Sequence, residues 1–249
     1  MTEPLDNAWP HSTEPFRADP PPGTTGIVIP MRDGMKFFRL CLHSVLDFTF
    51  PPYTLTVVDN LSGLQTKRRL RSLAQNHPME VLRYDEPFNF AAQVNMGLRH
   101  AFRFPNVEYG LILNADTVVE PEWLIRLLES ARYGYGAVGP LSNVAIPTQQ
   151  GPRENVTVAR DRLSGFCMLI RREAFEAVGG FDERFVGGGY EDQDFCLRLV
   201  QQGWKLGVDH RVHIHHFHRA FRTAHTAEME ANRVRFFEKH PALKEEVHG

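Results

Sequence analysis

The segment GLILNADTVVEPEWL, residues 110–124, holds the first side chains whose types and spacing could do chemistry. An apolar run, residues 111–113, stops at Asn114, and Asp116 follows two residues later. A carboxylate just past a buried strand can hold Mg²⁺ or Mn²⁺, hard cations that usually take one or two protein carboxylates plus substrate phosphates. The structural alternative is that Asp116 or Thr117 caps the helix that follows.

A second acidic cluster occurs in GGGYEDQDF, where a triple glycine precedes Glu191, Asp192 and Asp194. Carboxylates at the start of a helix are stabilised by its macrodipole, which would explain part of the cluster without any function. Like charges packed together also raise one another's pKa, which suits a general base that takes a proton from a hydroxyl. The glycines indicate a moving loop or a closely approaching substrate.

Four histidines lie in HIHHFHRAF, at positions 213, 215, 216 and 218. In a strand, His213 and His215 would share one face, and His216 and His218 the other. The four histidines could make a zinc site, although no cysteine lies nearby in sequence. The alternative is a set of ordinary polar strand residues.

Composition places these candidates in an ordinary globular protein. Of 249 residues, 42% are hydrophobic and 23% charged, and the net charge of -2 argues against a general nucleic-acid binder. Cys41, Cys167 and Cys196 form no CxxC pair, so we expect buried free thiols in a reducing compartment. With no signal segment and no membrane-spanning apolar run, we expect a cytosolic protein, with peripheral membrane association as an alternative.

The elements that must position the candidates form four strand–helix pairs, which predict an α/β fold: a mostly parallel central sheet with helices on both faces. The expected strands are TGIVIP (25–30), YTLTVVDN (53–60), MEVLRYD (79–85) and YGLILNAD (109–116). The expected helices are residues 34–48, 64–76, 90–102 and 120–133. The second half is less regular: we expect strands within 137–143, 163–171 and 205–221, a long loop after the first of these, and helices within 172–178, 191–201 and 226–241.

Polar residues fall where the predicted strands end, which is where ligands of parallel sheets collect. They are Asp59 and Asn60, Asp85 and Glu86, and Asn114 and Asp116. Each alone is more often a turn or cap residue. Together they predict one acidic cleft mouth.

Residues 1–24 are proline-rich and polar, and read as an extended arm before a single domain of residues 25–249 that ends in a helix. Trp9 and Phe16 could dock the arm on the domain or on a second copy, so a homodimer stays open. Three nucleotide or hydrolase motifs are absent: GxGxxG after the first strand, GxxxxGK[ST], and GxSxG.

From residue 25 to about residue 221, the chain resembles the inverting glycosyltransferases of family 2, which have the GT-A fold. The similarity lies in GIVIPMRDGMKFFRLCLHSV, LTVVDNLS, FNFAAQVNMGLRHA, LILNADTVVEPEWL, SGFCMLIRREAFEAVGGFDERF and GGYEDQDFCLRLVQQGW. These six segments keep the family's order and spacing. One departure is Asn114, which stands where the first aspartate of the DXD motif often stands.

The resemblance implies roles position by position. Asp59 would bind the nucleotide's base or ribose, Asp116 would coordinate Mn²⁺ or Mg²⁺ on the diphosphate, and His215 or His216 would complete the metal shell. Asp192 would be the general base, with Glu191 its competitor. The other implied donor-binding positions are Pro30, Asn60, Asn89, Asn95, Asn114, Ala115 and Gly165.

The activity implied by the resemblance is transfer of a sugar from a nucleoside-diphosphate sugar to an acceptor hydroxyl, with inversion. The acceptor would be a glycan, a lipid-linked glycan or a small molecule. A nucleotidyltransferase is the main rival, although PMRDGMKFF lacks the glycine-rich basic loop expected after the first strand. A non-catalytic sugar-nucleotide-binding module is the rival of another class.

Overall fold

The computed structural model describes residues 19–50, 52–84, 89–152, 156–159, 162–217 and 226–243. Several residues named above lie outside these ranges: Trp9, Phe16, Asp85, Glu86 and His218. Residues 1–18 of the expected arm lie outside them as well. Within the described part of the expected arm, Pro20 is buried and its carbonyl accepts a hydrogen bond of 3.2 Å from Asn106.

The described strands form one nine-stranded sheet in the order β3-β2-β1-β4-β8-β6-β9-β5, with β7 beside β9. Its parallel half holds β1 (Thr24–Met31), β2 (Tyr53–Asn60), β3 (Glu80–Tyr84) and β4 (Val107–Leu113). The antiparallel β8 (Cys167–Arg171) then joins β4 to β6 (Tyr135–Ser142), which runs parallel to β9 (Lys205–His216). Two short strands, β5 (Thr117–Val118) and β7 (Val156–Ala159), run antiparallel to β9.

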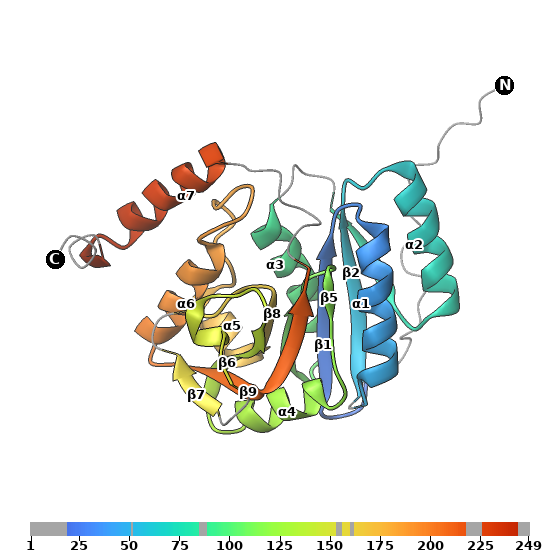
Figure 1. The fold of residues 1–249 in the computed structure, drawn as a ribbon, viewed down its shortest axis with the longest axis horizontal. Coiled ribbons are helices and arrows are strands. Elements are labelled where there is room, and N and C mark those ends of the chain that lie inside the picture. Colours follow the sequence, from blue (N-terminus) through green and yellow to red (C-terminus); the bar gives the residue numbers. More distant parts are fainter. Residues whose placement is uncertain are drawn as a thin grey trace.

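Helices cover both faces of the sheet, because alternate residues of each buried strand point to opposite sides (Figure 1). Ile27 and Ile29 of β1 pack into the core under α1 (Met35–Phe48), α2 (Leu64–Asn76) and α4 (Trp123–Ala131). Val28 packs into the opposite core with α3 (Phe90–Ala101), α5 (Arg172–Val178) and α6 (Glu191–Gln201). The last helix, α7 (Thr226–Lys239), lies at the edge of the molecule near α6. A short helix, η1 (Pro147–Gln149), lies in the loop after β6.

Two glycines let α3 approach the sheet closely. A Cβ at Gly97 would lie 2.2 Å from Cγ1 of Val28, and a Cβ at Gly26 would lie 2.4 Å from Cβ of Ala101. Both distances are shorter than any real contact, so only glycine fits at these crossings. The helix that follows β3 is thereby held close to the middle of the sheet.

The expected α/β sheet with helices on both faces is confirmed, and α2 and β2 have the expected bounds. The helix expected from residue 120 begins at Trp123, after Glu122 in a left-handed conformation (φ 65°). The capping role considered for Asp116 and Thr117 is wrong: neither precedes α4 directly, and the Thr117 hydroxyl donates instead to the Asn114 carbonyl at 2.7 Å. The three cysteines are buried free thiols, as expected. None of the helices described is both long and apolar enough to cross a bilayer.

Candidate active site

Asp116 lies between β4 and β5, next to the end of β9. The Phe217 N–H donates to the Asp116 carbonyl at 2.9 Å, which ties the two segments together. The Asp116 side chain is 3% exposed, and its Oδ1 accepts no hydrogen bond from any residue that the structure describes. This oxygen lies 3.2 Å from Nε2 of His216.

Strand pairing decides between the two candidate histidines. His216 pairs with Thr117 and His215 with Val118, so their side chains point to opposite faces. His216 is buried and stacks on Phe166 with ring centroids 5.3 Å apart, whereas His215 is exposed. The structure therefore brings His216, and not His215, to Asp116.

The chemistry of this pair fits a divalent cation. A buried carboxylate oxygen without a hydrogen-bond donor faces an imidazole nitrogen, and both atoms are ligands for Mn²⁺. The amide of Asn114 lies 3.5 Å from His216 Nε2 and carries no charge. Within the described ranges, no group of three or more His, Cys, Asp or Glu side chains could hold a metal. A cation here would need oxygen ligands from a substrate, as Mg²⁺ and Mn²⁺ sites often do.

Asp192 and Glu191 begin α6 and differ in their surroundings. Asp192 is half-buried, and it accepts hydrogen bonds from the N–H of Gly165 (3.0 Å) and of Gln193 (2.8 Å). Glu191 is buried, and its Oε2 has no hydrogen-bond partner among the described residues. Burial raises the pKa of both carboxyls, and with the neighbouring Asp192 charge it raises the pKa of Glu191 to about 8. The N–H groups of Gly165 and Gln193 oppose this rise in the pKa of Asp192, so Asp192 gives up its proton more readily than Glu191.

The two parts of the site are joined by the dipeptide Gly165–Phe166. The Gly165 N–H binds Asp192, while the Phe166 carbonyl accepts from the Asn114 N–H at 2.7 Å. The Phe166 ring also stacks on His216 at an interplanar angle of 18°. Two consecutive residues therefore connect Asp192 to the Asp116–His216 pair.

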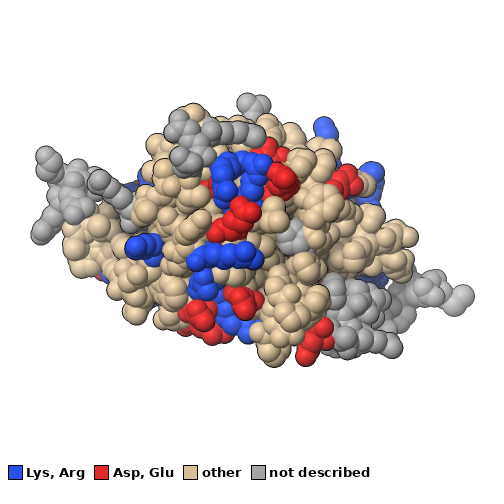
Figure 2. Space-filling model, turned by 90° about the horizontal axis from the view of Figure 1, so that it is seen from below, with Lys and Arg blue, Asp and Glu red and all other residues tan. Residues whose placement is uncertain are grey.

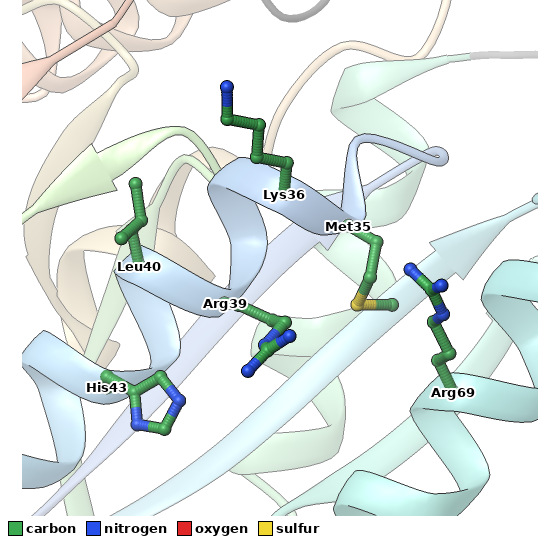
Figure 3. A pocket seen from close by; sticks show the side chains of 6 residues that line it. All are labelled: Met35, Lys36, Arg39, Leu40, His43 and Arg69. Atoms are coloured by element: carbon green, nitrogen blue, oxygen red, sulfur yellow. The ribbon is translucent and has the colours of Figure 1, made fainter.

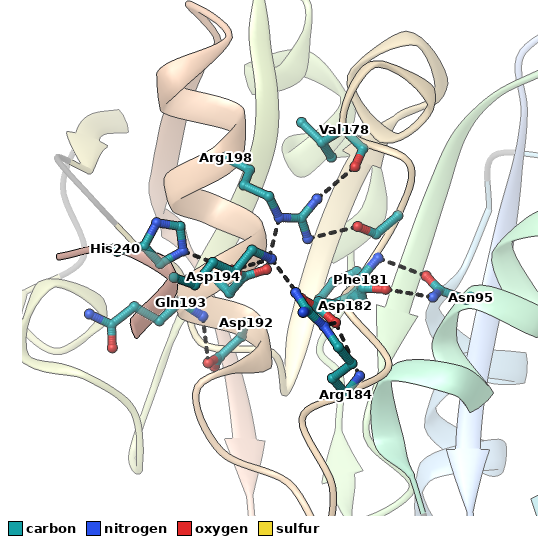
Figure 4. Close-up of polar contacts among 12 residues, drawn as sticks. Asn95, Val178, Phe181, Asp182, Arg184, Asp192, Gln193, Asp194, Arg198 and His240 are labelled. Carbon is teal, nitrogen blue, oxygen red and sulfur yellow. Dashed lines mark hydrogen bonds and ion pairs between the residues drawn. The ribbon is translucent and has the colours of Figure 1, made fainter. Parts of the chain in front are cut away.

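Asp194, the third carboxylate of the cluster, serves the structure of the C-terminal region (Figure 4). It is fully buried and accepts from Arg198 of its own helix at 2.8 Å. It also pairs with Lys239 and His240, each at 2.8 Å. These contacts with α6 and the end of α7 differ from those of Asp192, which accepts from Gly165.

Sequence reasoning missed Asn232 on α7, which holds the glycine loop before Glu191. Residues 187–189 have φ values of 76°, 94° and 102°, which favour glycine. Asn232 is 1% exposed, donates to the carbonyls of Val186 (2.9 Å) and Gly189 (3.0 Å), and accepts from the Val186 N–H (3.2 Å). A detectable signal was present, since Asn232 falls on the apolar helical face that includes Phe236.

Two residues predicted to contact the nucleotide lie at the end of β2 but are buried. Asp59 has no exposed surface and pairs with Arg83 at 2.6 Å. It also accepts from the Ser62 N–H at 3.3 Å. Asn60 is buried as well and donates to the Tyr84 carbonyl at 3.2 Å. Both shape the backbone at this edge of the sheet.

The remaining predicted positions fall into two groups. Asn89 caps α3 by accepting from the Ala92 N–H, and Asn95 is fully buried and bonded to the backbone of Phe181, so the structure does not bring their side chains to the site as ligand contacts. Pro30 and Ala115 are buried beside the site, in β1 and directly before Asp116. Gly165 is at the site: a Cβ there would lie 3.4 Å from Cβ of Asp192.

Two family models match the chain in succession. The model for glycosyl transferase family 2 matches residues 26–150, which is half of the chain. The model for the N-terminal domain of galactosyltransferase matches residues 155–226. The first match contains Asp116, and the second contains Gly165, Asp192 and His216.

Curated relatives are distant and longer. The O-antigen biosynthesis protein RfbC of Myxococcus xanthus is 28% identical over 242 residues, covering 84% of this chain but only 18% of the relative. The low-salt glycan biosynthesis hexosyltransferase Agl10 of Haloferax volcanii is 25% identical over 172 residues, covering 61% of this chain and 54% of the relative. The β-1,4-galactosyltransferase 7 of Drosophila melanogaster is 29% identical over 120 residues, covering 48% of this chain and 33% of the relative. The chain thus spans well under two thirds of these proteins.

Solved structures share the fold at low identity. GalNAc-T7 with UDP, GalNAc and Mn²⁺ superposes with a TM-score of 0.70 at 19% identity, covering 86% of this chain and 47% of that chain. The mannosyltransferase PcManGT of Pyrobaculum calidifontis, with GDP-Man and Mn²⁺, gives a TM-score of 0.67 at 19% identity. The superposition covers 93% of this chain and 68% of that chain. The family model shows that the chain belongs to glycosyl transferase family 2, and the sheet order and these neighbours show that it has the GT-A fold.

Proposed function

We propose that this chain transfers a sugar from a nucleoside-diphosphate sugar to an acceptor hydroxyl, with inversion at the anomeric carbon. One observation carries the proposal: Gly165–Phe166 joins Asp192 to the Asp116–His216 pair, so a proton acceptor lies beside a candidate diphosphate site. Family membership supports the reaction class. The neighbours bound to UDP or GDP-Man with Mn²⁺ support a nucleotide-sugar donor and a divalent cation.

On the donor side, Asp116 and His216 would hold Mn²⁺ or Mg²⁺ together with diphosphate oxygens. When bound, such a cation acts as a Lewis acid that neutralises the charge the leaving diphosphate gains. Asn114 supplies no second anionic ligand, so the diphosphate itself has to contribute more of the ligands than at a site with two aspartates. The buried Asp59 would act on the nucleotide through the backbone of Ser62 and through Arg83.

On the acceptor side, Asp192 would accept the proton of the attacking hydroxyl. The N–H groups of Gly165 and Gln193 fix the orientation of its carboxylate. Burial keeps the Glu191 carboxyl protonated at pH 7 through its raised pKa of about 8, so it places no second negative charge beside the base. A single displacement from the face opposite the leaving group inverts the configuration.

The test is a screen of UDP-, GDP- and dTDP-sugars with Mn²⁺, with the released products identified. Release of nucleoside diphosphate together with glycosylation of an acceptor, at inverted configuration by NMR, supports the proposal. Release of pyrophosphate would show a nucleotidyltransferase instead. Donor binding by calorimetry without turnover on any glycan, lipid-linked or small-molecule acceptor would show a binding module.

We further propose that the protein acts in the cytosol, a reducing compartment that suits its three buried free thiols. A lipid-linked acceptor would lie at a membrane surface, and the protein would then bind that surface peripherally.

A further inference from the structure

A groove of about 320 Å³ runs between α1 and α2, outside the candidate active site (Figure 3). Basic side chains from both helices line it. The lining residues are Met35, Lys36, Arg39, Leu40, His43 and Arg69. We call these six residues the α1–α2 groove.

The charge of the groove is not neutralised. Arg39 and Arg69 are exposed and form no ion pair or hydrogen bond with any residue that the structure describes. α2 contains four cations and no acidic residue, and the acidic residue of α1 is Asp47, in its last turn. Asp33 is the nearest carboxylate before α1. It already accepts hydrogen bonds from the Gly63 N–H at 3.0 Å and from the Thr66 hydroxyl at 2.8 Å.

Charges of opposite sign are mixed on another part of the surface. On the end of the molecule seen in Figure 2, Lys and Arg side chains are interleaved with Asp and Glu. Arg126 and Arg233 have carboxylate partners, in the pairs Arg126–Glu122 and Arg233–Glu230. A chain with a net charge of -2 thus gathers unpaired positive charge at the α1–α2 groove.

Exposed apolar side chains accompany these cations. Lys36, Leu40 and His43 recur on one stripe of α1, and Leu40 is 45% exposed in the middle of that stripe. Leu64, which begins α2, is 52% exposed. Binding of a soluble phosphate does not require exposed leucine side chains. A helix face that mixes basic and apolar residues instead suits the boundary between lipid headgroups and acyl chains.

We propose that the α1–α2 groove docks the protein on an anionic lipid bilayer. Lys36, Arg39 and Arg69 contact lipid phosphates, and Leu40 enters the headgroup boundary. α1 starts four residues after β1 ends at Met31, so docking here holds the cleft mouth near the membrane surface. Docking at this groove would present a lipid-linked acceptor to the candidate active site. Only that step rests on the proposed function.

The experiment is co-sedimentation of the full chain with vesicles of phosphatidylcholine, or of equal parts phosphatidylcholine and phosphatidylglycerol. We expect binding to the mixed vesicles alone, weakened by salt. Each basic residue near such a surface contributes about fivefold to the binding constant, so Arg39→Gln/Arg69→Gln should weaken binding by about tenfold or more. Leu40→Ser should weaken it as well.

The matched control is Arg132→Gln/Lys205→Gln, which removes two exposed cations elsewhere with the same change in net charge. Equal losses in both double variants, or equal binding of the wild type to neutral vesicles, would overturn the proposal. So would calorimetric binding of inorganic phosphate or soluble polyphosphate, lost in Arg39→Gln/Arg69→Gln, without vesicle binding. Donor turnover on a soluble acceptor is measured in parallel: intact turnover without vesicle binding rejects the docking alone, and vesicle binding without turnover rejects the proposed function alone.

Discussion

Nε2 of His216 lies 3.2 Å from Oδ1 of Asp116, because the short strand β5 pairs with the end of β9 and so brings the two side chains to one point. This distance identifies His216 as the histidine of the cluster that faces a carboxylate, that of Asp116. It also separates His216 from His215, which the same strand turns outward.

His216→Ala should reduce Mn²⁺-dependent donor turnover by at least about 10- to 100-fold, the loss typical even for groups that only support a metal ligand. The physical reason is the removal of the nitrogen that faces Asp116. His215→Ala is the matched control and should leave turnover and Mn²⁺ dependence unchanged. Titration of activity against Mn²⁺ is the measurement, and equal behaviour of the two variants would contradict the role of His216.

The pKa of Glu191 predicts a pH-dependent stability. Its ordinary value is 4.5 and burial raises it to about 8, so between these values the folded state holds a proton that the unfolded state has released. Stability therefore falls as pH rises through this window, by an amount on the order of a few kcal/mol. Glu191→Gln removes the titrating group, so its free energy of unfolding should change less between pH 5 and pH 8.5. Urea unfolding of both proteins at the two pH values is the measurement. An equal change in the free energy of unfolding between the two pH values in both proteins would contradict the raised pKa of Glu191.

Asn232→Ala should disorder the glycine loop before Glu191. The change leaves the Val186 N–H and the carbonyls of Val186 and Gly189 without their partner, at a cost of about 1–3 kcal/mol. If the loop positions Asp192, kcat should fall more than donor affinity, and hydrogen exchange should rise at residues 186–190. Asn76→Ala, which removes an exposed side-chain bond to Ser72, is the control. Faster exchange in the loop with an unchanged kcat would show that Asn232 serves stability only.

Gly97→Ala should destabilise the domain by about 1–3 kcal/mol, the usual cost of overpacking a core. The added Cβ would meet Cγ1 of Val28 at 2.2 Å and Cγ2 of Val58 at 3.1 Å. Val28→Ala in the same chain should recover part of the loss by making room, which thermal unfolding can measure. A single variant as stable as the wild type would mean that α3 shifts away from the sheet at little cost.

The regular half of the fold could be predicted because local patterns are strong there. β2 and α2 each carry an uninterrupted periodicity, and their bounds match the expected residues. β5 could not be predicted, since Thr117–Val118 is a strand only through its partner β9, far away in sequence. The start of α4 was misplaced for a similar reason, because the left-handed Glu122 is held by its surroundings and not by its own preference.

For the site, residue types predicted which carboxylates gather but not what each one does. Asp59 and Asn95 carry chemically capable groups, yet both are fully buried and bonded within the protein. Choosing between His215 and His216 required the register of β9. The structural role of Asp194 depends on α7, whose packing against α6 no local pattern encodes.

The last prediction concerns the proton acceptor. Asp192→Asn keeps the size and polarity of the side chain, but an amide cannot accept the hydroxyl proton at neutral pH. Loss of a general base typically costs about 10²–10⁴-fold in rate, so kcat should fall by that amount while donor affinity stays near that of the wild type. In the wild type the N–H groups of Gly165 and Gln193 bind different oxygens of Asp192, so the asparagine can keep one of these two hydrogen bonds through its amide oxygen.

Two neighbouring variants make the test discriminating. Glu191→Gln should retain most of the rate at pH 7, because the raised pKa of Glu191 keeps the carboxyl protonated and a glutamine resembles that form. Asp194→Asn should lower stability first, since it weakens a fully buried group paired with Arg198, Lys239 and His240. Single-turnover rates, donor binding by calorimetry and thermal unfolding are measured on all three. Should Glu191→Gln lose the rate while Asp192→Asn keeps it, the base is Glu191, and the hydrogen bond from Gly165 to Asp192 serves the loop alone.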